Sequence, residues 1–167
     1  MNTDLIKNLR EKTGAGIMAC KSALESSNGD LEKAEKILQE QGIASARKKI
    51  GRNAQEGIIS SYIHANNKIG VLLEINCETD FVANTDDFKD LAHNITMQIA
   101  AMNPIYIDVE SNPTILDDEK PSKDNSLLSQ QFIKDNEKSI QDLIEETSGK
   151  LGEKIEVKRF QRFAISE

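Results

Sequence analysis

The chain has 167 residues and a formal net charge of −7 at pH 7; 38% of its residues are hydrophobic and 29% are charged. These values are typical of a soluble globular protein with a real core. The acidic balance argues against direct nucleic-acid binding, which usually needs a basic face. No apolar stretch reaches the ~20 residues that span a bilayer, so we expect no membrane contact.

The first fifty residues predict three short helices. Apolar residues recur at helical spacing in three segments, and a TGAG run at residues 13–16 separates the first two. This run favours a tight turn over an anion-binding loop, because no phosphate-loop lysine follows it. Asp30 is expected to cap the third helix and Gly42 to end it. A basic stretch at residues 46–52 then predicts a solvated linker helix.

Strands are predicted next. Residues 57–64 and 69–78 are rich in β-branched side chains, and the second segment alternates apolar with polar residues, which indicates one buried face. The following helix should carry an apolar stripe from Phe88 to Met102 and end at Pro104. Residues 108–126 are polar and predict a loose surface segment.

The C-terminal part predicts one more helix and one more strand. Apolar residues from position 140 to 151 mark the helix, and Gly149 and Gly152 should break it. In the final strand, residues 154–165, Phe160 falls out of phase, which indicates a bulge or a strand covered on both faces.

The predicted fold class is therefore α+β. A small N-terminal three-helix domain with a linker helix (residues 1–53) precedes a core (residues 54–167) in which an antiparallel sheet of about three strands packs against helices.

The residues offer no lead to enzyme chemistry. His64 and His93 lack Cys or His neighbours at metal-ligand spacing, and no nucleophile motif is present. We therefore predict no metal site, no cofactor and no catalytic residue. Cys20 and Cys77 lie far apart in sequence, and no secretory signal opens the chain, so we expect free thiols and a cytoplasmic location.

The connection after the second strand is unusual because it places Asp80 beside Phe81. Such a connecting loop could insert the ring into a partner while the carboxylate meets a cation. Alternatively, Phe81 or Val82 packs on Phe88 and Asp80 is an ordinary turn acid. Spacing alone favours this second interpretation.

Five motifs decide between them. They are residues 9–24 (LREKTGAGIMACKSAL), 54–59 (AQEGII), 71–83 (VLLEINCETDFVA), 102–104 (MNP) and 152–160 (GEKIEVKRF). Together they cover most of the chain, which resembles translation elongation factor Ts.

This resemblance implies a ubiquitin-associated-like fold for the head. It also implies that the protein is a non-enzymatic guanine nucleotide exchange factor for the GTPase elongation factor Tu, and that it binds this GTPase in both the GDP-bound and the nucleotide-free state. It implies that Phe81 wedges between partner helices, that Asp80 perturbs the surroundings of the partner's Mg²⁺, and that Thr79 and Val82 shape and pack the insertion. The factor would then act in a bacterial cytoplasm, or in an organelle stroma or matrix.

On the head, the resemblance nominates Arg10, Ile17, Met18 and Lys21 as partner contacts. Met18 fits a place in the core of the head equally well.

The chain departs from the family pattern in three ways. It has one half-core where long members have two, like short bacterial forms, some of which act as homodimers, so a symmetric homodimer is a hypothesis. It lacks roughly thirty residues of a helical excursion between Pro104 and Gln130, and Gln98 replaces a histidine of many relatives. The alternatives are a partner-binding module that has lost exchange activity, and a small hydrolase whose site the sequence does not reveal.

Overall fold

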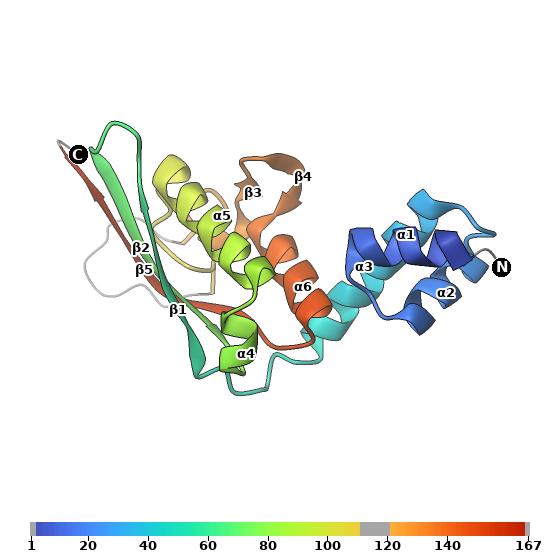
Figure 1. The fold of residues 1–167 in the computed structure, drawn as a ribbon. Helices are drawn as coiled ribbons and strands as arrows, with labels where there is room; N and C mark the ends of the chain where they lie inside the picture. The colour runs from blue at the N-terminus through green and yellow to red at the C-terminus, as the bar shows by residue number, and fades with distance from the viewer. Residues whose placement is uncertain (1–2, 111–120, 166–167) are drawn as a thin grey trace.

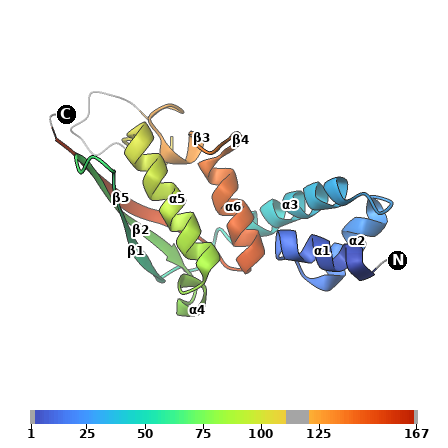
Figure 2. The same cartoon turned by 45° about the horizontal axis from the view of Figure 1, so that its top comes forward.

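A computed structural model describes residues 3–110 and 121–165. The chain forms a helical head at one end and a β-sheet at the other, with two long helices side by side between them (Figure 1). The second view shows the same sequence of layers, from the sheet through α5 (Asp86–Met102) and α6 (Ile140–Leu151) to α3 (Leu31–Arg47) and the head (Figure 2). The predicted α+β class is confirmed.

The head consists of α1 (Thr3–Thr13), α2 (Ile17–Ser26) and the first half of α3 (Leu31–Arg47). As predicted, Asp30 caps α3: its carboxylate accepts the backbone N–H of Lys33 at 3.1 Å. The small core of the head is formed by Leu9, Cys20, Ala23, Leu24, Ala34 and Leu38.

The prediction that the third helix ends at Gly42 is wrong, because α3 continues to Arg47. A Cβ added to Gly149 of α6 (Ile140–Leu151) would lie 2.6 Å from the Gly42 Cα, so α3 and α6 cross at these two glycines. Close packing there outweighs the cost of about 1 kcal/mol for glycine inside a helix. For the same reason α6 passes through Gly149 and ends only at Gly152, which is left-handed (φ 80°).

The main sheet is antiparallel, with the strand order β1-β2-β5. Its strands are β1 (Glu56–Ile63), β2 (Ile69–Cys77) and β5 (Glu156–Ala164). The first two agree with the predicted segments to within one residue. The third contains a bulge, which was one of the two alternatives that the sequence left open. Glu74 of β2 pairs with Arg159 and the next residue, Ile75, pairs with Val157, so Lys158 is left unpaired in the register.

One face of this sheet is covered by α5 (Asp86–Met102), which begins at the predicted cap region with Thr85 as its N-cap. The predicted stripe of α5 is confirmed except for Met102, which is half exposed. The shared core is formed mainly by Val71, Leu73, Ile75, Phe88, Leu91, Ile95, Ile99, Ile140 and Ile144.

A small hairpin that precedes α6 was not predicted from the sequence. A 3-10 turn, η1 (Leu127–Ser129), leads into β3 (Gln131–Phe132) and β4 (Asp135–Ser139). Gln98, fully buried in α5, accepts the N–H of Ile133 at 2.9 Å and thereby holds this hairpin. Short polar strands carry no apolar alternation, which explains the miss.

Residues 111–120 of the predicted loose segment lie outside the described residues. The boundary near residue 53 stays a prediction. The predicted linker helix at residues 46–52 is wrong beyond Arg47, where α3 ends and turns follow, and it is the C-terminal half of α3 that packs on α6. None of the helices in the described part of the chain has the length and apolarity needed to cross a membrane.

Candidate functional site: two exposed contact surfaces

The connection after β2 contains one helical turn, α4 (Asp80–Ala83), where the sequence predicted only a loop. Thr79 is its N-cap, and the Thr79 hydroxyl accepts the backbone N–H of Val82 at 3.5 Å. The Asn84 side-chain amide donates to the Asp80 carbonyl at 2.8 Å. These contacts give residues 79–84, hereafter the insertion loop, a defined backbone at the lower end of the sheet (Figure 1).

The insertion loop exposes its aromatic ring. Phe81 is 84% exposed, whereas Val82 and Ala83 are buried in the core that contains Phe88. The structure therefore assigns the packing role to Val82 and leaves Phe81 free of the core. Asp80 is exposed beside it. An exposed ring on a short capped helix has lost little freedom by folding and can fill a partner's apolar pocket.

Two residues at the base of the insertion loop have shifted pKa values. Glu78 Oε1 accepts the backbone N–H of Lys154 at 2.6 Å and lies 3.3 Å from the Arg52 guanidinium. The Lys154 N–H, aided by Arg52, holds the pKa of the Glu78 carboxyl below its usual value. Burial raises the pKa of the Cys77 thiol to about 11, so the thiol stays protonated near pH 7.

The basic stretch after α3 is not simply solvated, contrary to the prediction. Lys49 is buried and its Nζ donates to the Ser148 carbonyl at 3.0 Å. Burial lowers the pKa of this ammonium. Arg47 pairs with Glu145 at 3.2 Å. The stretch therefore fastens the head to the core.

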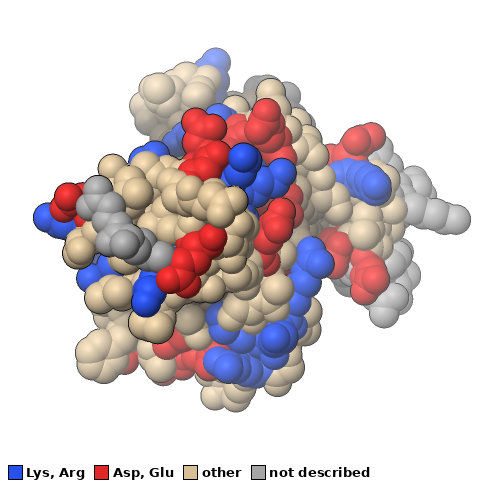
Figure 3. Space-filling model, turned by 90° about the vertical axis from the view of Figure 1, so that its right-hand side faces the viewer, with Lys and Arg blue, Asp and Glu red and all other residues tan. Residues whose placement is uncertain are grey.

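The second exposed surface lies on the head. Met18 is 74% exposed and Ile17 is also exposed, both in the first turn of α2. This exposure removes Met18 from the core of the head. Lys21 follows one turn later and lies 4.0 Å from Glu25, and Arg10 is exposed on α1. Acidic and basic side chains are interspersed on the face that includes the head (Figure 3).

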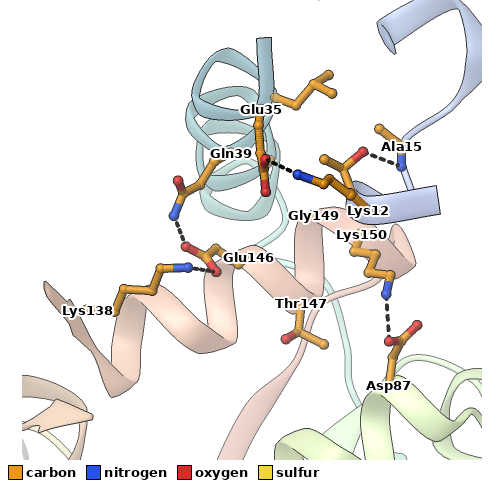
Figure 4. A pocket seen from close by; sticks show the side chains of 13 residues that line it. Lys12, Ala15, Glu35, Gln39, Asp87, Lys138, Glu146, Thr147, Gly149 and Lys150 are labelled. Carbon is orange, nitrogen blue, oxygen red and sulfur yellow. Dashed lines mark hydrogen bonds and ion pairs between the residues drawn. The ribbon is translucent and has the colours of Figure 1, made fainter. Parts of the chain in front are cut away.

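A cleft of about 380 Å³ separates the head from the core. Its charged groups are paired with one another: Lys150 with Asp87 at 2.6 Å, and Lys138 with Glu146 at 2.8 Å (Figure 4). Gln39 of α3 also donates to Glu146. The two ion pairs link α5, α6 and the hairpin within the core, and the Gln39–Glu146 hydrogen bond joins α3 to α6.

Metal chemistry finds no support in residues 3–110 and 121–165, where no three His, Cys, Asp or Glu side chains are grouped to hold an ion. The insertion loop and the first turn of α2 both expose large apolar side chains. An α+β core and a helical head that each expose such side chains are typical of a class of proteins that act by binding other proteins.

Comparisons with known proteins identify the family. The family model described as Elongation factor TS matches residues 25–120. A protein named Elongation factor Ts from Thermoanaerobacter sp. is 47% identical over 195 positions, covering 100% of this chain and 96% of the relative. Its namesake from Thermotoga maritima is 47% identical over 193 positions, covering 100% and 97%. The chain belongs to the elongation factor Ts family.

The alignment also bears on length. It runs over 195 positions with the Thermoanaerobacter protein, 28 more than the 167 residues of this chain. This difference agrees with the internal deletion that the sequence indicated.

Proposed function

We propose that the chain is a guanine nucleotide exchange factor that releases GDP from elongation factor Tu and stabilises the nucleotide-free GTPase. The observation that carries the proposal is the exposure of Phe81, at 84%, on a capped helical turn beside Asp80. Membership of the elongation factor Ts family supplies the partner. The chain acts non-enzymatically, in the cytoplasm where elongation takes place.

In the proposed mechanism the two exposed residues have different targets. Phe81 enters between helices of the GTPase, and Asp80 disturbs the ligands of its Mg²⁺, which screens the phosphates of GDP. Thr79 and Val82 hold the helical turn that carries Phe81, because the Thr79 hydroxyl caps α4 and the Val82 side chain packs in the core.

The energetics need only modest coupling. Each ~1.4 kcal/mol by which the factor disfavours bound GDP weakens nucleotide binding tenfold. Coupling between two ligands of one protein is reciprocal, so a newly bound nucleotide expels the factor by the same ratio.

The head contributes affinity in this proposal. Ile17 and Met18 offer an exposed apolar pair, with Lys21 and Arg10 nearby for acidic groups of the GTPase. Docking of the head raises the effective concentration of the insertion loop at the nucleotide site. The Gln39–Glu146 hydrogen bond and the Arg47–Glu145 ion pair join α3, which carries the head, to α6 of the core and so keep the two surfaces in a fixed relation.

We also propose that the chain pairs with a second copy through the sheet face opposite α5. That face exposes Ile59, Ile63, Leu72, Phe163 and Ile165. Ile63, Leu72, Phe163 and Ile165 line one open groove on this face, and an exposed apolar surface of this kind is typical of a protein interface. Light scattering should give a dimer mass for the wild type and a monomer mass for Phe163→Glu. A monomeric wild type at working concentration contradicts the dimer.

The direct test follows release of fluorescent GDP from elongation factor Tu. The wild type should accelerate release strongly, and Asp80→Ala should blunt this acceleration, while Asp90→Ala, an exposed acid of α5, should not. Unchanged release with tight binding would instead identify a partner-binding module without exchange activity.

A further inference from the structure

The insertion loop is held by a carboxylate from a distant part of the chain. Glu153 lies in the turn between α6 and β5. Its Oε2 accepts the backbone N–H of Glu78 at 3.1 Å and that of Thr79 at 3.0 Å. Its Oε1 accepts the Thr79 hydroxyl at 2.6 Å. One charged group thus receives three hydrogen bonds from two consecutive residues.

These bonds act on the helical turn that carries Phe81. The Thr79 hydroxyl can donate only one hydrogen, and Glu153 takes it. The lone pairs of the hydroxyl are then directed at the Val82 N–H, which is the N-cap bond of α4. Glu153 therefore fixes the side-chain rotamer of Thr79 on which the cap depends.

The contact is reciprocal. While Glu153 accepts two N–H groups from the end of β2, Glu78 accepts the N–H of Lys154 at 2.6 Å. Two adjacent carboxylates from two different loops thus each bind the backbone of the other loop. Such an exchange sets the distance and the orientation between them more narrowly than a single hydrogen bond.

The turn that carries Glu153 is itself anchored. The Glu153 carbonyl accepts the Ser148 hydroxyl at 2.5 Å, and the Ser148 carbonyl accepts Lys49 Nζ at 3.0 Å. A continuous chain of bonds therefore runs from Lys49, two residues after the end of α3, through the end of α6, to the insertion loop. These bonds fix the position of the helical turn that carries Phe81 relative to α3, the helix that carries the head.

The Phe81 ring cannot hold its own place, because it is almost wholly exposed. We infer that Glu153 is a positioning residue for exchange: it holds the insertion loop in its docking geometry before the partner arrives. This inference rests on the proposed function. A loop that populates this geometry only part of the time inserts correspondingly less often.

Two variants separate positioning from charge. Glu153→Ala removes all three acceptor contacts. Glu153→Gln keeps an oxygen for the two N–H groups and places an amide donor at the Thr79 hydroxyl, so it removes the charge and reverses one hydrogen bond while keeping a contact at all three positions. Glu137→Ala, on the exposed side of β4, is the matched control.

The first readout needs no partner. Amide hydrogen exchange at Glu78 and Thr79, followed by NMR, should be at least about tenfold faster in Glu153→Ala than in the wild type. It should stay within about threefold of wild type in Glu153→Gln. Unchanged protection in Glu153→Ala overturns the inference, whatever the partner does.

The second readout is the rate of GDP release from elongation factor Tu, measured against factor concentration. Glu153→Ala should lower the maximal rate about tenfold, equivalent to ~1.4 kcal/mol, while the half-saturating concentration changes little because the head still docks. Glu153→Gln should restore most of the rate. If Glu153→Ala gives the same maximal rate as the wild type, the inference is overturned. If the wild-type protein itself does not accelerate GDP release, the proposed function is refuted, and the amide hydrogen exchange result alone decides whether Glu153 holds the loop.

Discussion

Adding one methyl group on either side of the α3–α6 crossing should have opposite effects on stability. Gly42 and Gly149 face each other across this crossing, but their surroundings are not equivalent. A Cβ on Gly42 would lie 3.8 Å from the Gly149 Cα, which is an ordinary contact. A Cβ on Gly149 would lie 2.6 Å from the Gly42 Cα and 2.8 Å from its carbonyl carbon and oxygen.

The magnitudes follow from these distances. Gly42→Ala gains up to about 1 kcal/mol of helix propensity without a clash. In Gly149→Ala the new methyl meets backbone atoms that cannot rotate away, so the helices must separate by about 1 Å to restore contact distance. Overpacking of this kind costs about 1–3 kcal/mol, which exceeds the propensity gain.

Thermal unfolding followed by circular dichroism measures both effects. For a chain of this size, Gly42→Ala should raise the midpoint by about 2–4 °C and Gly149→Ala should lower it by about 2–6 °C. A Gly149→Ala protein that is as stable as Gly42→Ala would refute the close crossing. Because α3 carries the head, Gly149→Ala should also weaken binding to elongation factor Tu, whereas Gly42→Ala should not.

Three further predictions concern single residues. Ser139 forms a capping box with Asp142 at the start of α6, so Ser139→Ala should cost about 1 kcal/mol in urea unfolding, and an unchanged midpoint argues against the cap. The folded pKa of Glu78 lies below its ordinary value of 4.5, so its stabilisation is present above that pH and is lost as the pH falls through the folded pKa. Glu78→Gln should therefore lose less stability than the wild type as the pH falls below about 4.5, and an equal loss in both proteins contradicts this role. Met18→Ala should weaken binding to the GTPase several-fold, measured by titration calorimetry, without changing the melting temperature; wild-type affinity removes Met18 from the contact.

Local patterns in the sequence predicted most of the helices and strands, because each pattern depends on neighbours within a few residues. The two glycines at 42 and 149 show where this ends. Each is a helix breaker by its own propensity, and only the other glycine, more than a hundred residues away, explains why both helices continue. The β3–β4 hairpin was missed for a similar reason, since a buried amide of α5 organises it.

The candidate site was predictable in part. The resemblance nominated Asp80 and Phe81, and the residues around them left two interpretations open until the exposure of the ring was known. Glu153 gave no local signal, because an acid after a helix-terminating glycine is common in surface turns. Its role depends on contacts with Glu78 and Thr79, which precede it by 75 and 74 positions in the chain.

The central claim, that insertion of the Phe81 ring drives nucleotide release, is tested most directly by the maximal rate of fluorescent GDP release from elongation factor Tu at saturating Phe81→Ala. The matched control is Met102→Ala, a half-exposed apolar residue at the C-terminal end of α5. Both variants should melt like the wild type, because neither side chain is part of the core. We predict a rate at least about tenfold below wild type for Phe81→Ala and a wild-type rate for Met102→Ala. A wild-type rate for Phe81→Ala would contradict the account.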